Sequence, residues 1–89
     1  MLLIIKESFD KDVEKVQNKE LLIRLSESIR QIEKANQIKE IPNIKKLKGY
    51  KNHYRIKLGD YRIGCEIFGK DIYLVRFLHR KDMYRYFPR

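Results

Sequence analysis

The stretch HYRIKLGDYRIGCEI, residues 53–67, constrains the fold more than any other part of this sequence. Polar and apolar residues alternate on both sides of a Gly59-Asp60 pair. Such alternation is typical of strands with one buried face. A two-residue Gly-Asp connection favours a type I′ or II′ turn between antiparallel strands. The stretch therefore predicts a β-hairpin.

The turn also predicts how the two strands of this hairpin are paired. From the turn outward, the expected pairs are Leu58–Tyr61, Lys57–Arg62, Ile56–Ile63, Arg55–Gly64 and His53–Glu66. A slip of one residue would turn the apolar side chains to the wrong face, so the apolar pattern supports this register. Because paired side chains share a face, we expect helices to cover the face that contains Tyr54, Ile56, Leu58, Tyr61, Ile63 and Cys65.

The opposite face of the hairpin is expected to carry Arg55, Lys57 and Arg62 together. Like charges directly opposite each other destabilise a sheet by a few tenths of a kcal/mol up to about 1 kcal/mol. A cationic cluster that lowers stability is a candidate phosphate site. Gly64, opposite Arg55, is expected to leave room for a ligand to approach.

Two helices are expected before the hairpin. The apolar run Leu2–Lys6 resembles a short buried strand. Ser8 is expected to cap the first helix, and Asn18 marks a break before the second. The second helix has an apolar stripe that consists of Leu21, Leu22, Leu25, Ile29 and Ile32. This pattern predicts an amphipathic helical hairpin that packs on a sheet.

The remaining segments complete an α+β pattern. Pro42 excludes a helix through residues 38–50, which are expected to be irregular. A second hairpin at Gly69-Lys70 leads into a strand over residues 72–78, and the tail is expected to form one helical turn. We therefore expect a single small domain over residues 1–89, with an N-terminal strand and two helices on one face of a twisted antiparallel sheet.

The positive charge of the chain is placed unevenly. Residues 1–44 contain eight Lys or Arg and eight Asp or Glu, whereas residues 45–89 contain thirteen and four. The second half therefore carries the whole net charge of +9. Such a concentration indicates a surface for a polyanion, namely nucleic acid, an acidic protein or an anionic membrane. A solvated face without a ligand is the commoner explanation of charge alone.

Several classes of site find no support in the sequence. The two histidines and one cysteine lack zinc spacing, and no Gly-rich phosphate loop or G-x-S-x-G motif is present. We expect no metal and no cofactor. Cys65 has no partner for a disulfide and is expected to be a small core residue. The opening LLII is too short to span a membrane, so a cytoplasmic protein is expected.

A cluster of basic side chains suits the cleavage of RNA. The 2′-hydroxyl attacks the adjacent phosphorus, and cations bind the phosphate and neutralise the charge that develops on it. No metal is required, because the substrate supplies the nucleophile. His53 and His79 are candidate acids or bases, and His79 is favoured because it adjoins Arg80. Tyr84 and Tyr86 are candidates for stacking on a base or donating a proton.

Three segments together resemble the RelE/ParE superfamily of bacterial and archaeal toxins: SFDKDVEKV, KLKGYKNHYRIKLGDYRIGCEI and VRFLHRKDMYR. The likeness covers nearly the whole chain in the right order. It implies a fold with two helices against an antiparallel sheet. In the RelE branch, the toxin enters the ribosomal A site and cuts messenger RNA there. The resemblance therefore implies a type II toxin that is a ribosome-dependent, metal-independent mRNA endoribonuclease and inhibits translation.

The resemblance also implies which residues carry the activity. By motif, the catalytic basic positions of the RelE branch fall on Arg55, Lys57, Arg62 and Arg80. The catalytic tyrosine falls on Tyr84 by a compact spacing or on Tyr86 by a longer one. Arg55 occupies a position where Lys also occurs in the family, which weakens a proton-transfer role there and keeps phosphate binding.

Further basic residues and a protein partner complete the expectation. The residues expected to bind RNA are Lys45, Lys46, Lys48, Lys51 and Arg85. The resemblance implies a cognate, acidic antitoxin that neutralises the toxin, with a monomeric toxin that forms a hetero-oligomer with its antitoxin. Two alternatives stay open: a ParE-like toxin that poisons DNA gyrase without nuclease activity, and an inactive remnant that only binds its antitoxin.

Overall fold

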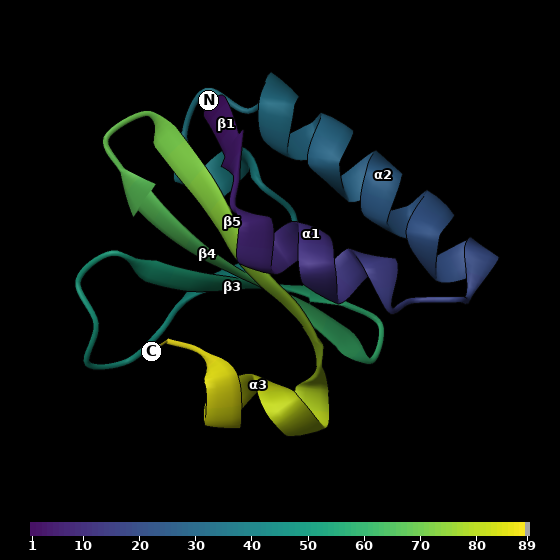
Figure 1. Ribbon diagram of the computed structural model, residues 1–89. Coiled ribbons are helices and arrows are strands. Elements are labelled where there is room, and N and C mark those ends of the chain that lie inside the picture. The colour runs from purple at the N-terminus through teal and green to yellow at the C-terminus, as the bar shows by residue number, and fades with distance from the viewer. Residues whose placement is uncertain (89) are drawn as a thin grey trace.

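Residues 1–88 fold into five strands, three α-helices and one short 3₁₀ helix (Figure 1). This computed structural model describes residues 1–88; Arg89, the last residue of the expected domain, lies outside the described residues. In chain order, the elements are β1 (Leu2–Ile5), α1 (Glu7–Glu14), α2 (Lys19–Lys34), η1 (Ile38–Glu40), β2 (Ile44–Lys46), β3 (His53–Leu58), β4 (Tyr61–Phe68), β5 (Asp71–His79) and α3 (Arg80–Tyr86). The predicted α+β class is confirmed.

The five strands form one sheet in the order β1-β5-β4-β3-β2. The pairs β5–β4 and β4–β3 are antiparallel, as expected. The pair β3–β2 is also antiparallel, whereas β1 lies parallel to β5. The sheet is therefore mixed, and β5 lies beside β1 although three other strands come between them in the sequence. The strand expected over residues 2–6 is confirmed at Leu2–Ile5, but its expected burial is wrong: β1 is an edge strand, and Leu2 is 63% exposed.

The β3–β4 hairpin has the register that its turn predicts. All five expected pairs are present, from Leu58–Tyr61 next to the turn to His53–Glu66 at the far end. Ile56, Ile63 and Cys65 are fully buried on the face toward α2, which confirms the expected covered face. Arg55 and Lys57 alternate with these residues and therefore project from the opposite face.

Helix α2 closes the main core. The side chain of Asn18 accepts a hydrogen bond from the Leu21 N–H at 3.2 Å, so the break expected at this residue is the helix cap. Leu21, Leu25 and Ile32 are buried, as the stripe predicts. The buried cluster consists of Phe9, Leu21, Leu25, Ile32, Ala35, Ile41, Ile56, Ile63, Cys65, Ile67, Ile72, Leu74 and Phe77.

Beyond the end of β1, side chains of helix α1 form the hydrogen bonds to the free edge of β5. The Ser8 hydroxyl donates to the Val75 carbonyl at 2.6 Å, and the Asp12 carboxylate accepts from the Phe77 N–H at 2.9 Å. Two side chains thus satisfy backbone groups of β5 that have no neighbouring strand. The expected cap at Ser8 is wrong, since Lys6 is the N-cap residue and Ser8 is used for this tertiary contact.

The segment before the hairpin is more regular than its sequence predicts. Residues 44–46 form β2, which pairs with β3 so that Lys45 lies opposite Arg55. The expectation of an irregular segment is wrong here. Three residues are too few to show a period of two, and the open edge of β3 supplies the hydrogen bonds that make this segment a strand.

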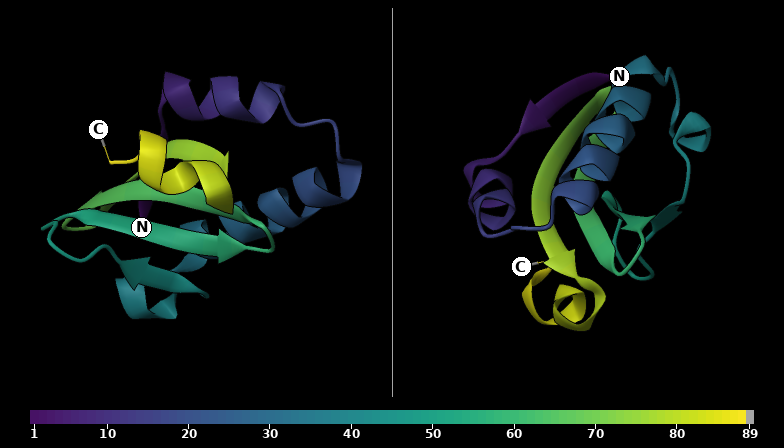
Figure 2. Two further views of the ribbon diagram at one scale, coloured as in Figure 1. Left: turned by 90° about the horizontal axis from the view of Figure 1, so that it is seen from below. Right: turned by 90° about the vertical axis from the view of Figure 1, so that its right-hand side faces the viewer.

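Helix α3 lies on the side of the sheet away from α2 (Figures 1 and 2). Met83 and Phe87 are each 2% exposed and lie outside the main buried cluster, so they form a second, smaller core. A Cβ atom at Gly64 would lie 2.8 Å from two ring carbons of Phe87. The space at Gly64 was expected to admit a ligand, but Phe87 occupies it. The tail is also longer than one turn, because α3 has seven residues.

Candidate functional site

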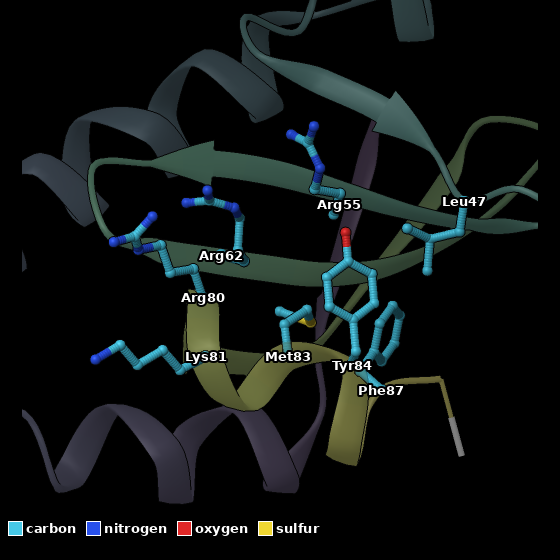
Figure 3. A pocket seen from close by; sticks show the side chains of 8 residues that line it. All are labelled: Leu47, Arg55, Arg62, Arg80, Lys81, Met83, Tyr84 and Phe87. Carbon is cyan, nitrogen blue, oxygen red and sulfur yellow. The ribbon is translucent and has the colours of Figure 1, made fainter.

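Three arginines meet in one cavity on the face of the sheet that carries α3 (Figure 3). The cavity has a volume of about 490 Å³. Its lining residues are Leu47, Arg55, Arg62, Arg80, Lys81, Met83, Tyr84 and Phe87. Strand β3 supplies Arg55, strand β4 supplies Arg62, and α3 supplies Arg80. The two strands of one hairpin and the C-terminal helix therefore bring their cations to one place.

The floor of this cavity is apolar. Phe87 fits against Gly64, and Gly64 is paired with Arg55 across the hairpin. Met83 lies beside Phe87 in the same lining. A nonpolar floor strengthens the attraction between the arginines and an anion, because it lowers the local dielectric constant.

The Gly59-Asp60 turn positions two of the three arginines. Nη1 of Arg62 donates to the carbonyl oxygens of Gly59 at 2.8 Å and of Tyr61 at 2.9 Å. The backbone N–H of Arg80 donates to the Asp60 carbonyl at 2.7 Å, which ties the start of α3 to the turn. Nε of Arg80 lies 3.8 Å from Oδ1 of Asp60, but both side chains are more than half exposed, so this ion pair is weak.

Only one of the two candidate tyrosines lies with the arginines. Tyr84 is 80% exposed and lines the cavity, and its hydroxyl points toward Arg55 in Figure 3. Tyr86 lines a different cavity of about 440 Å³, and its ring centroid lies 5.7 Å from Cζ of Arg76. The geometry therefore selects Tyr84 as the tyrosine of this site.

Lys57 lies at the margin of the site. It is exposed and paired with Arg62 across the hairpin, which places both side chains on one face. It lines a small cavity of about 120 Å³ beside α2, however, and is absent from the lining of the arginine cavity. The structure thus brings Arg55, Arg62, Arg80 and Tyr84 together and leaves Lys57 next to them.

Neither histidine lines the arginine cavity. Nδ1 of His79 accepts a hydrogen bond from the Lys81 N–H at 3.2 Å, so His79 caps α3. Its ring lies 5.5 Å from that of Tyr61, on the other side of the sheet from the arginines. Nε2 of His53 lies 3.0 Å from a carboxylate oxygen of Glu66. Both histidines have structural contacts in these positions.

The five basic residues expected to bind RNA divide into two groups. Lys45, Lys46 and Lys48 line a groove of about 390 Å³ that adjoins the arginine cavity. Lys51 and Arg85 are exposed, but they line neither hollow.

Sequence reasoning missed the apolar part of the site and one cation. Met83 and Phe87 form its floor, and Lys81 lines it beside Arg80. The available signal for Phe87 was a glycine within a strand, which indicates close approach of another group. Nothing in the sequence identifies that group, because Gly64 and Phe87 are far apart along the chain.

The described part of the chain offers no residues for a metal site, a membrane-spanning helix or a reactive cysteine. Within residues 1–88, no three His, Cys, Asp or Glu side chains are grouped so that they would hold a metal ion. No helix in the same range has the length and apolar character needed to cross a membrane. Burial raises the pKa of the Cys65 thiol to about 12, so the thiol stays protonated in the core, as expected of a structural cysteine.

Comparisons with known proteins agree on one superfamily. Residues 3–84 match the family model described as the ParE toxin of the type II toxin-antitoxin system parDE. The chain is 39% identical to the toxin RelE3 of Methanocaldococcus jannaschii, over 99% of this chain and 100% of that protein.

Solved structures share the same fold. The RelB-RelE antitoxin-toxin complex of Methanococcus jannaschii matches with a TM-score of 0.81 and 39% identity, covering 96% of this chain and 99% of that one. The archaeal RelE-RelB complex of Pyrococcus horikoshii matches in fold, with a TM-score of 0.72 at 23% identity over 92% and 97% of the two chains. The chain therefore belongs to the RelE/ParE superfamily of type II toxin-antitoxin toxins.

Proposed function

We propose that this toxin is a ribosome-dependent mRNA endoribonuclease that inhibits translation. The observation that carries the proposal is the shared cavity of Arg55, Arg62, Arg80 and Tyr84. Three guanidinium groups form hydrogen bonds with phosphate oxygens in fixed geometry, and they remain charged at every physiological pH. The likeness to a RelE toxin at 39% identity supports the same branch. A ribosomal target places the activity in the cytoplasm.

The arginines act on the charge of the transition state. When the 2′-hydroxyl oxygen bonds to phosphorus, the bond to the 5′-oxygen breaks and a 2′,3′-cyclic phosphate forms. Negative charge grows on the nonbridging oxygens, where Arg55, Arg62 and Arg80 stabilise it. The nucleophile belongs to the substrate, so this route uses no metal.

Two side chains are candidates for the proton transfers. The hydroxyl of Tyr84 points into the arginine cavity, and Lys57 lies across the hairpin from Arg62. A Tyr84→Phe variant keeps the ring for stacking and removes the proton. A cleavage rate that falls at least tenfold with a changed pH profile assigns proton transfer to Tyr84. An unchanged rate and profile would exclude Tyr84 and leave Lys57 as the remaining candidate of the two.

The partner in this proposal is an acidic antitoxin, encoded alongside, that neutralises the toxin in a hetero-oligomer. Two solved relatives are complexes of RelE with RelB. The net charge of +9, concentrated after residue 44, suits an acidic partner. The toxin without its antitoxin is a monomer in this proposal.

Induced expression with mapping of transcript ends tests the activity. We expect growth arrest and new cuts in translated messages for the native chain. Arg62→Ala should reduce cutting by about 100-fold or more, which is typical for loss of one charge-stabilising donor. Arg30→Ala, on the exposed side of α2, is the control and should leave cutting unchanged. Full toxicity of Arg62→Ala at equal expression, with antitoxin binding retained, contradicts the proposal.

The second candidate is a ParE-like toxin that poisons DNA gyrase. The match of residues 3–84 to a ParE family model favours it. Induction should then trigger the SOS response to DNA damage and produce no new transcript ends. An inactive remnant that binds only its antitoxin would give neither result, and growth would continue.

A further inference from the structure

A groove continues from the arginine cavity between β2, the loop that follows it and the end of α3. It has a volume of about 390 Å³. Its lining residues are Lys45, Lys46, Leu47, Lys48, Tyr50, Arg55, Tyr84, Phe87 and Pro88. Four of these, Leu47, Arg55, Tyr84 and Phe87, also line the arginine cavity. The two hollows therefore adjoin at these four residues, and a chain-like ligand held in one can reach the other.

An exposed aromatic ring is fixed in place at this groove. Tyr50 is 45% exposed, yet its N–H donates to the Leu47 carbonyl at 3.2 Å. Its ring centroid lies 5.2 Å from that of His53. His53 is held in turn, because its Nε2 lies 3.0 Å from a carboxylate oxygen of Glu66 and its ring centroid lies 5.6 Å from that of Phe87. A ring held in this way loses little entropy when a flat ligand stacks on it.

Positive charge lines the same groove. Lys45 lies directly opposite Arg55 in the β2–β3 pairing, so both side chains share a face. Lys46 and Lys48 are also exposed along the groove. Among residues 1–88, no Asp or Glu lines it. Cations beside an exposed aromatic ring match single-stranded RNA, whose phosphates need charge and whose bases need a stacking partner.

We propose that this groove binds the nucleotide of single-stranded RNA that flanks the nucleotides at the cleavage site. Its phosphate lies against Lys45 and Lys48, and its base stacks on Tyr50. This inference rests on the proposed function, because the adjoining arginines are taken to hold the phosphate that is cut. An acidic peptide would also satisfy the lysines, but it has no base for the ring of Tyr50.

Binding of an RNA that resists cleavage tests this proposal. The probe is a labelled 2′-O-methyl RNA of about ten nucleotides, a length within the range that single-stranded sites cover. Its blocked 2′-oxygens remove the nucleophile, so fluorescence anisotropy measures binding by the toxin without cleavage. Tyr50→Leu should weaken binding by about fivefold or more, the usual effect of losing one stacked base. Lys48→Gln should weaken it and make it less sensitive to salt.

Matched variants lie at the turn between β4 and β5. Phe68→Leu changes an aromatic ring that is 48% exposed, close to the 45% of Tyr50, and Lys70→Gln changes an exposed turn lysine. Both should leave RNA affinity unchanged within about twofold. Equal effects of the Tyr50→Leu and Phe68→Leu variants overturn the proposal.

Two further probes separate RNA from an acidic peptide. An abasic strand of the same length keeps the phosphates and lacks the bases, so Tyr50→Leu should not change its affinity. A glutamate peptide of equal charge should bind more weakly than RNA. If Tyr50→Leu weakens the peptide and the RNA equally, the groove is a peptide site and the proposal is wrong. These results do not depend on cleavage, so they are separate from the transcript test of nuclease activity.

Discussion

Two arginines on the sheet, Arg55 and Arg76, have opposite surroundings. Arg55 is paired with Gly64 across the β3–β4 hairpin, and Gly64 is paired with Arg76 on the other side. Nε and Nη2 of Arg76 donate to the two carboxylate oxygens of Asp12 at 2.7 and 3.0 Å. This hydrogen-bonded pair raises the pKa of Arg76. Within residues 1–88, no hydrogen bond or ion pair holds the guanidinium of Arg55.

The difference shows that neighbours, rather than residue type, decide what an arginine does. No carboxylate from residues 1–88 lines the cavity of Arg55, whereas Asp12 and Asp82 both line the cavity of Arg76. A guanidinium whose donors are already satisfied by a buried carboxylate stabilises the fold. One with open donors beside other cations is available to an anion. Gly64, which the ring of Phe87 covers, lies between the two arginines in the sheet.

Removing the carboxylate of Asp12 should give the largest effect on stability. Asp12→Ala leaves Arg76 without its partner and the Phe77 N–H without an acceptor. Removing one partner of a buried ion pair costs about 3–5 kcal/mol, and the loss should lie toward the lower end of this range because Arg76 is 26% exposed. Urea denaturation should show this loss, while Glu14→Ala, an exposed change on the same helix, should stay within about 0.5 kcal/mol. Equal losses in the two variants would mean that Asp12 has no special structural role.

A side chain at Gly64 should disturb the packing of the Phe87 ring on Gly64, between the two arginines. In Gly64→Ala, the new Cβ would lie 2.8 Å from the ring of Phe87, so the ring must move. Such overpacking destabilises a protein by about 1–3 kcal/mol.

A double-mutant cycle identifies the cause of that loss. Phe87→Leu on its own removes packing, but in the Gly64→Ala background it also relieves the clash. The two losses should therefore add to more than the loss in the double variant. Strict additivity in urea denaturation would show that the ring and the glycine are not coupled.

The pH dependence of the free energy of unfolding tests whether the thiol of Cys65, on the face of the sheet toward α2, is shielded from water. Burial raises the pKa of Cys65 from 9.0 to about 12. Above pH 9 the unfolded chain loses this proton while the folded chain keeps it, so stability falls as the pH rises toward 12. The loss approaches about 1.4 kcal/mol per pH unit. Between pH 8 and 10, the free energy of unfolding of the native chain should fall by about 1.4 kcal/mol more than that of Cys65→Ala. Parallel curves would place the thiol in contact with water.

The hairpin and its cationic face were predictable because they depend on local rules. A two-residue turn and alternation on both strands set the register, so the shared face of Arg55 and Arg62 follows from the sequence alone. Contacts between distant segments were not predictable. The pairing of Asp12 with Arg76 depends on where α1 meets β5, and that meeting has no local signature.

Removing the unpaired arginine should have the smallest effect on stability. Arg55→Met keeps most of the apolar stem and removes a charge that lies near Arg62 and Arg80. Because no partner is left behind and repulsion decreases, the free energy of unfolding should change by less than about 0.5 kcal/mol. Arg76→Met leaves Asp12 buried and alone, so its loss should be several times larger. A loss of about 2 kcal/mol or more in Arg55→Met would make both arginines structural and remove the physical reason for assigning phosphate binding to only one of them.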